Sequence, residues 1–211
     1  VKAFKDALAG TGANIVHEEY APVATSDFTA PAERLFNALK DKPGRKVIFI
    51  IWAGGGGNPF KIAELNPGRY GIEVSTGGNI LPALASYKAL PGMEGATYYY
   101  YEHPKNAVNK WLVTEHQKRF NSPPDFFTAG GMSAGIAAVE ALKKAGSTDT
   151  EKLIAAMEGM SFESPKGRMT FRKEDHQAMQ SMFHFKIKVD PKVAWAIPEL
   201  VREIKPEEMK V

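Results

Sequence analysis

The feature of this sequence that most limits its fold is a run of six apolar residues, Val47 to Trp52, which ends shortly before four glycines at 54–57. A short apolar run closed by turn-forming residues is typical of a parallel strand buried on both faces. Similar strand-like segments occur at 13–19, 70–75 and 96–101, and helical spacing of apolar residues marks 1–8, 32–39, 59–65, 79–90 and 107–120. This alternation predicts βαβ units. We therefore expect an α/β fold with a doubly wound parallel sheet, right-handed connections and helices on both faces.

The pattern changes after Pro123 and Pro124. Two helices follow one another at 130–145 and 150–157, before a β-like segment at 168–171 and an alternating strand at 182–189. Because no strand separates these two helices, they cannot extend the same parallel ladder. They either dock on the first sheet or belong to a second one.

Composition narrows the class of protein. With 211 residues, 44% of them hydrophobic, the chain is long enough for one or two globular domains. Its formal charge of +3 is small and scattered, which gives no electrostatic case for binding nucleic acid or a membrane surface. No apolar run approaches the roughly 18 residues of a membrane span. The chain opens at Val1 without a basic and apolar leader, so we expect a processed or truncated polypeptide.

The same composition limits the chemistry. The absence of cysteine excludes disulfides, thiolate zinc sites and a cysteine nucleophile. The five histidines are scattered and show no zinc-binding spacing. We therefore expect no metal and no cofactor.

Ligands of open α/β sheets bind at the carboxyl ends of the strands, where loops and helix N-termini converge. This rule places four loops on one rim, at 21–28, 52–58, 76–79 and 99–104. The glycines at 54–57 fit neither phosphate-binding signature, because no Gly-Lys-Ser/Thr follows them and Pro59 stands where a dinucleotide fingerprint has its third glycine. A ligand-facing loop is favoured, with a nucleotide-phosphate cradle and a plain flexible turn as alternatives. Trp52 beside it is either a stacking surface for a ligand or part of the core.

Gly131 to Gly135 match the G-x-S-x-G pattern of α/β-hydrolases, with Ser133 as the nucleophile. That elbow needs a buried strand directly before it, and Pro123 and Pro124 argue against one. The small residues of this segment fit a closely packed helix better. A small serine hydrolase using Ser133 is kept as the alternative function.

Several segments, in this order, resemble the periplasmic solute-binding proteins of branched-chain amino-acid ABC transporters, the leucine/isoleucine/valine-binding family. The resembling stretches are 3–8, 19–22, 25–29, the apolar strand with glycine-rich 53–58, 92–97, 137–149 and 172–177. The resemblance implies a type I periplasmic-binding-protein-like fold, in which two α/β lobes close on a ligand about a hinge. It also implies that residues 1–120 form the second lobe, that 121–180 return to the first lobe and cross the hinge, and that 181–211 form a C-terminal strand and tail.

In that family the ligand is clamped between the lobes, and the resemblance assigns ligand binding from this side to the two glycine-containing rim loops and to aromatic neighbours. The residues so assigned are Trp52, Gly54, Gly55, Asn58, Thr76, Gly77, Gly78, Asn79 and Tyr100. Amino-acid binders of this type carry an acidic residue near Gly77 for the ligand's ammonium group, and this sequence has none there. Because an unpaired buried ammonium is costly, an aromatic or other small carboxylate becomes a stronger expectation beside a branched-chain or hydrophobic amino acid.

The expected function is thus that of a non-enzymatic, periplasmic or extracellular membrane-tethered solute receptor that delivers its ligand to an ABC permease. The expected partners are a small-molecule solute and that permease, without nucleic acid or direct membrane insertion.

Overall fold

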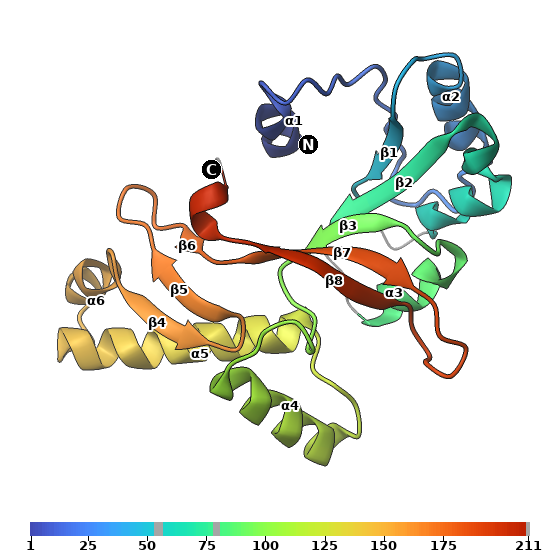
Figure 1. The fold of residues 1–211 in the computed structure, drawn as a ribbon. Helices are drawn as coiled ribbons and strands as arrows, with labels where there is room; N and C mark the ends of the chain where they lie inside the picture. Colours follow the sequence, from blue (N-terminus) through green and yellow to red (C-terminus); the bar gives the residue numbers. More distant parts are fainter. Residues whose placement is uncertain (53–56, 78–80, 210–211) are drawn as a thin grey trace.

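The computed structural model describes residues 1–52, 57–77 and 81–209, and it contains two sheets (Figure 1). The first sheet has five strands in the order β1-β2-β3-β7-β8, and the second has three in the order β4-β5-β6. The strands are β1 (Lys46–Ile50), β2 (Ile72–Gly77), β3 (Glu94–Thr97), β4 (Ser161–Ser164), β5 (Gly167–Phe171), β6 (Ala178–Met179), β7 (Met182–Lys188) and β8 (Ile197–Ile204). The predicted parallel ladder is confirmed for β1, β2 and β3, and β7 and β8 extend it in the antiparallel sense.

Helices lie before, between and after these strands. They are α1 (Lys2–Leu8), α2 (Thr29–Leu39), α3 (Leu81–Ser86), α4 (Ala107–Phe120), α5 (Phe126–Ala145) and α6 (Thr150–Met157), with 3-10 helices η1 (Pro59–Leu65), η2 (Pro67–Tyr70), η3 (Tyr87–Ala89) and η4 (Pro206–Glu208). The α-helix expected at 59–65 is a 3-10 helix, because Pro59 and the Asn58 cap favour a start but Asn66, in the left-handed conformation, stops it. No helix among the described residues is long and apolar enough to cross a bilayer.

The main core lies on one face of the five-stranded sheet. Alternate residues of β2 point into it, as Ile72 and Val74 do, and α2 covers them with Phe36. Burial on both faces, expected for the run at 47–52, is wrong. Ile48 is buried, but Val47 is 39% exposed and Ile51 is 54% exposed.

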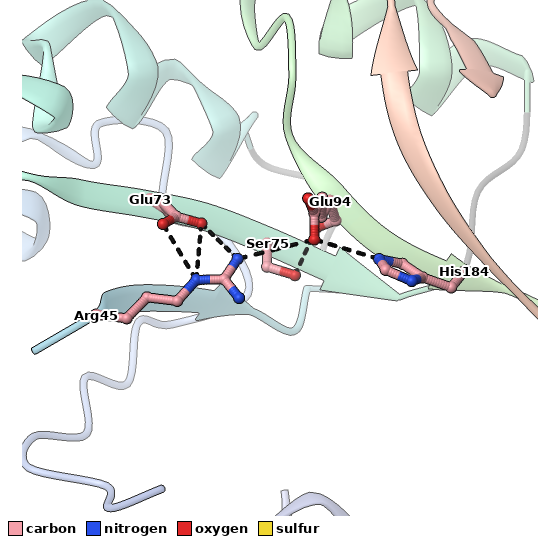
Figure 2. A network of polar contacts seen from close by, with 5 residues as sticks. All are labelled: Arg45, Glu73, Ser75, Glu94 and His184. Atoms are coloured by element: carbon pink, nitrogen blue, oxygen red, sulfur yellow. Dashed lines mark hydrogen bonds and ion pairs between the residues drawn. The ribbon is translucent and has the colours of Figure 1, made fainter. Parts of the chain in front are cut away.

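The opposite face of the sheet carries polar side chains, and Figure 2 shows how they join its strands. The Arg45 guanidinium, just before β1, binds the Glu73 carboxylate of β2 at 2.6 Å and reaches the Glu94 carboxylate of β3 at 3.8 Å. Glu94 also contacts His184 Nε2 of β7 at 3.3 Å, and Ser75 Oγ donates to the Glu94 backbone carbonyl. The four charged or titratable side chains are between 30% and 63% exposed, so their ion pairs stabilise the sheet only modestly.

The strand expected at 13–19 is absent. No described strand pairs with this segment, and Ile15 and Val16 are exposed. A strand needs a neighbour to satisfy its backbone groups, so β-type sequence alone does not produce one. Ion pairs hold the segment instead, from Lys5 to Glu18 and from Arg34 to Glu19.

The two helices after Pro124 belong to the second sheet. Ala137 and Ala141 of α5 pack with Phe162 of β4 and Met169 of β5 in a separate hydrophobic cluster. Of the two arrangements that the sequence allowed, the structure therefore has the second sheet (Figure 1).

Helix α4 also lies with this second unit. Its Leu112 packs against Ala129 of α5 and Tyr99 of the preceding segment. The chain therefore leaves the first sheet between Tyr98 and Asn106, before α4, rather than near Phe120. It returns between β6 and β7, so that residues 182–204 are two strands of the first sheet.

Candidate functional site

The rim predicted from the sequence exists at the carboxyl ends of β1, β2 and β3. Ile50 is in register with Thr76, and Gly77 with Ala96, so these ends meet at one edge of the sheet. In parallel sheets of this type, the loops that bind ligands gather at this edge, at the carboxyl ends of the strands.

Thr76 is at this rim, but its side chain faces inward. It is buried, and its Oγ1 donates a hydrogen bond of 3.0 Å to the Ile50 carbonyl. The same hydroxyl contacts the phenol of Tyr87, whose burial raises its pKa to about 12. Thr76 thus joins β2 to β1 and to the core, and Gly77, the next residue, is the exposed end of the strand.

Trp52 lies just beyond β1, half-buried, with its ring edge-on to Phe28 at a centroid distance of 5.2 Å. Its Nε1 is shielded from solvent and donates to no partner in the part of the chain that the structure describes. An indole N–H usually finds an acceptor when buried. Trp52 is therefore both an aromatic wall and an unused donor at the rim.

Two of the predicted rim loops touch each other at Gly57. A Cβ on this residue would lie 2.9 Å from the Ser26 Cα and 2.9 Å from the Thr25 carbonyl oxygen. Only glycine allows so close an approach of two backbones. Gly57 thus fixes the loop that carries Trp52 against the loop that carries Phe28. Gly57 belongs to the predicted glycine-rich loop, but it was not among the residues assigned to ligand binding.

Asn58 starts η1 and is half-buried. Its Oδ1 accepts a hydrogen bond of 3.0 Å from the Phe60 backbone N–H, which fixes the orientation of the side-chain amide. The Nδ2 group has no partner among the described residues and remains a donor at the rim.

Tyr100 lies elsewhere, in the core. It is buried, its hydroxyl accepts a hydrogen bond of 3.2 Å from Trp195 Nε1, and its ring packs on Tyr101 and His103. Residues 98–101 are not a strand, so the expected alternation of faces does not occur. Tyr98 is half-buried and lies nearer the second unit, against the Phe126 ring at 4.6 Å.

The remaining predicted ligand residues, Gly54, Gly55, Gly78 and Asn79, lie outside the described residues. Among the described residues, no group of three acidic or histidine side chains is arranged to hold a metal ion.

The nucleophile assignment for Ser133 is wrong. Ser133 is in the interior of α5, and its buried Oγ donates a hydrogen bond of 2.7 Å to the Ala129 carbonyl one turn earlier. No strand leads directly into it, since α4 and the first two turns of α5 precede it, so there is no strained turn to present the hydroxyl. The small residues around it serve helix packing, with Ala129 and Ala137 buried on the same side.

Comparison with known proteins gives a consistent picture. The family model described as "Periplasmic binding protein" matches residues 1–192. A curated relative, the "Leu/Ile/Val-binding protein homolog 6" of Brucella abortus, is 26% identical over 86% of this chain and 47% of its own length. The chain thus spans about half the length of the curated relatives it matches.

Two solved structures from Rhodopseudomonas palustris are similar in both sequence and fold. One, described as an ABC-type branched-chain amino acid transporter, is 71% identical with a TM-score of 0.91, over 99% of this chain and 56% of that one. The other is a solute-binding protein of an ABC transporter in complex with 3,4-dihydroxybenzoic acid. It is 32% identical with a TM-score of 0.77, over 96% of this chain and 55% of that one.

Proposed function

Because this chain belongs to the periplasmic binding protein family, we propose that it is part of the substrate-binding component of an ABC transporter and binds a small solute without reacting on it. The observation that carries the proposal is the family match over residues 1–192. The two lobes of such a protein close on the solute about a hinge, and the protein then delivers the solute to a membrane permease. The location that goes with this role is the periplasm, or the outer surface of the cell with a membrane tether.

The proposed solute is an aromatic or other small carboxylate, ahead of a branched-chain or hydrophobic amino acid. The described rim offers the neutral donors Asn58 Nδ2 and Trp52 Nε1 beside the rings of Trp52 and Phe28. Asp27, the carboxylate nearest to Phe28 in the chain, is exposed, and hydrogen bonds from the Thr29 hydroxyl and the Thr29 N–H lower its pKa. An ammonium group would find no buried carboxylate in this set, whereas a flat carboxylate finds rings and N–H donors. The 3,4-dihydroxybenzoic acid bound by the relative at 32% identity belongs to this class.

The test is ligand-dependent stability of the full-length protein. We expect 3,4-dihydroxybenzoate or benzoate to raise the melting temperature more than leucine, isoleucine or valine at equal concentration. A ligand that binds only the folded state adds about 2.7 kcal/mol of stability at a hundred times its Kd. A panel of these compounds that gives no shift would refute the proposal, and a shift with leucine alone would refute the carboxylate assignment.

Trp52→Phe tests the contribution of the rim. It keeps an aromatic ring but removes the N–H donor, and we expect about 3- to 10-fold weaker binding of the best ligand by isothermal titration calorimetry, the effect of one lost hydrogen bond. The matched control is Trp111→Phe, because Trp111 is exposed on α4, away from the rim. Equal affinity in both variants would contradict a ligand contact at Trp52.

A further inference from the structure

A groove of about 810 Å³ lies between the two sheets, where the chain crosses from one to the other. We call it the crossover groove. Its walls come from the crossing segment at 103–106, from the start of β5, from the return at 179–183 and from β8 with η4. The predicted rim loop at 99–104 reaches this groove through His103 and Pro104, but Trp52, Asn58 and Thr76 do not line it. The groove is therefore distinct from the site around those three residues.

Lys166 is the buried charge of this groove. It stands in the turn between β4 and β5 and is only 8% exposed. The turn is fixed from two sides, since Lys166 N–H donates to Ser164 Oγ at 3.1 Å and Asn106 Nδ2 donates to the Pro165 carbonyl at 3.2 Å. The backbone that carries the Lys166 side chain is therefore held at the wall of the groove.

The contacts of the Lys166 ammonium group are all neutral. Nζ donates to Gln180 Oε1 at 3.1 Å and lies 4.8 Å from the centre of the Tyr98 ring. An ammonium carries three donors, and no carboxylate of the described residues lies within ion-pair distance of it. Burial accordingly lowers the pKa of Lys166 with nothing to offset it. A buried cation without a counter-charge is costly, and an anion in the groove would remove that cost.

The wider charge of the groove has the same sign. Its lining includes the basic residues Lys105, Lys166, Arg168 and Lys205 and the acidic residues Glu203 and Glu207. Glu203 is already paired with Lys205 at 2.9 Å. Positive charge is therefore in excess around Lys166.

His103 supplies a second, independent polar atom. It is 6% exposed and lines the same groove. Its Nε2 must carry the proton, because it lies 2.7 Å from the Pro198 carbonyl, which can only accept. Burial lowers the pKa of His103, so the ring is neutral and Nδ1 is an acceptor. This buried Nδ1 has no hydrogen-bond partner among residues 1–52, 57–77 and 81–209.

The groove also has apolar walls, from Phe183, Met179, Leu200 and Pro104. An occupant that satisfies all of these groups needs a negative charge for Lys166, an O–H for His103 Nδ1 and a largely apolar body. We propose that the crossover groove is a second ligand site, which binds a small hydroxylated organic carboxylate between Lys166 and His103.

The experiment uses the full-length protein with labelled lysine side chains, and 4-hydroxybenzoate and benzoate as probes. The readout is the lysine Nζ and Cε nuclear magnetic resonance signal of Lys166, assigned with Lys166→Arg, because this signal reports on the groove and not on the rim. We expect 4-hydroxybenzoate to shift it saturably, while the signal of exposed Lys173 stays in place. A Lys166 signal that does not move at millimolar probe would overturn the proposal, whatever binds at the rim.

Calorimetry of variants tests each half of the site. Lys166→Met should weaken this binding event by about 10- to 100-fold, the effect of losing a charged hydrogen bond, whereas Lys173→Met should not change it. In the unmodified protein, 4-hydroxybenzoate should bind about 3- to 10-fold more tightly than benzoate, and His103→Phe should abolish this preference. Unchanged affinity in Lys166→Met would contradict the assignment. So would a His103→Phe variant that still prefers 4-hydroxybenzoate to benzoate as strongly as the unmodified protein. If Lys166→Met does not fold, the response of the Lys166 signal to 4-hydroxybenzoate in the unmodified protein still tests whether the groove binds this probe.

Discussion

Replacing Gly95 by alanine tests the packing of the first sheet most directly. Gly95 is in the central strand β3, between β2 and β7. An added Cβ would lie 2.5 Å from the Thr76 carbonyl oxygen and 2.8 Å from the Phe185 ring. Favourable contacts between carbon atoms lie at about 3.5–4.0 Å, so both neighbours would have to move.

The expected cost follows from these neighbours. Overpacking a core costs about 1–3 kcal/mol, and the upper end applies because the nearest atom is backbone of a paired strand and Phe185 is fully buried. Alanine also reduces the conformational entropy of the unfolded chain, which offsets about 0.4–1 kcal/mol of this cost. We therefore expect Gly95→Ala to lower the free energy of unfolding by about 2 kcal/mol.

The assay is urea unfolding of the full-length protein, followed by circular dichroism. With an m-value of about 2 kcal/mol/M, the midpoint should fall by about 1 M. The matched control is Gly135→Ala, because Gly135 is within α5 and its added Cβ would meet nothing within 4 Å. That variant should gain about 0.5–1 kcal/mol from helix propensity. A Gly95→Ala protein as stable as the parent, or two variants that change in the same direction, would refute this reasoning.

Three further outcomes are expected. Asp149→Ala removes the side chain that caps α6 through the Lys152 backbone N–H, and urea unfolding should detect a loss of about 1 kcal/mol; no loss would mean that the cap is replaced by water. Burial lowers the pKa of His103 below its unfolded value of about 6.5, so the unfolded state binds more protons and stability should fall as pH drops below about 6.5. The His103→Phe variant should lose this part of the pH dependence of the melting temperature, and an unchanged profile would contradict it. Thr76→Val removes the hydrogen bond to the Ile50 carbonyl and should cost about 1 kcal/mol in the same urea assay, whereas a neutral result would show that this bond adds nothing.

The elements read most accurately from the sequence are those whose ends carry their own signals. The bounds of α4 and α6 agree with the predicted 107–120 and 150–157, and Asn106 and Asp149 cap their first turns. Helix α5 begins at Phe126, four residues before the predicted start at 130, and Asp125 caps it. Capping is a local interaction between a side chain and the next few N–H groups, so the sequence contains all of it. The parallel order of β1, β2 and β3 also followed from the alternation of strand and helix.

The failures concern interactions between distant segments. The segment at 13–19 has β-type sequence but no neighbouring strand, and β8 has a neighbour, β7, although its sequence carries many charged residues. The G-x-S-x-G pattern at 131–135 matched a motif, but its chemistry depends on a preceding strand that is not there. In each case the partner decides the structure, and the partner is not encoded in the segment itself.

The candidate sites divide in the same way. The rim could be located from the sequence, since the carboxyl ends of successive parallel strands meet at one edge, and Trp52, Asn58 and Gly57 lie there as loop residues should. The crossover groove could not, because Lys166 and His103 are far apart in the chain and neither stands in a recognisable motif. Whether a lysine is solvated or buried without a counter-charge depends on which surfaces close around it.

The sequence by itself determined the strand–helix alternation, the ends of α4 and α6 and the family, because these depend on short-range periodicity, capping and the order of segments. Only the tertiary structure decided which face of the sheet is covered, that Tyr100 is in the core, and that α4 packs with the second unit. Burial, desolvation and pairing are properties of atoms brought together from distant parts of the chain, and they are fixed only when the two sheets are in place.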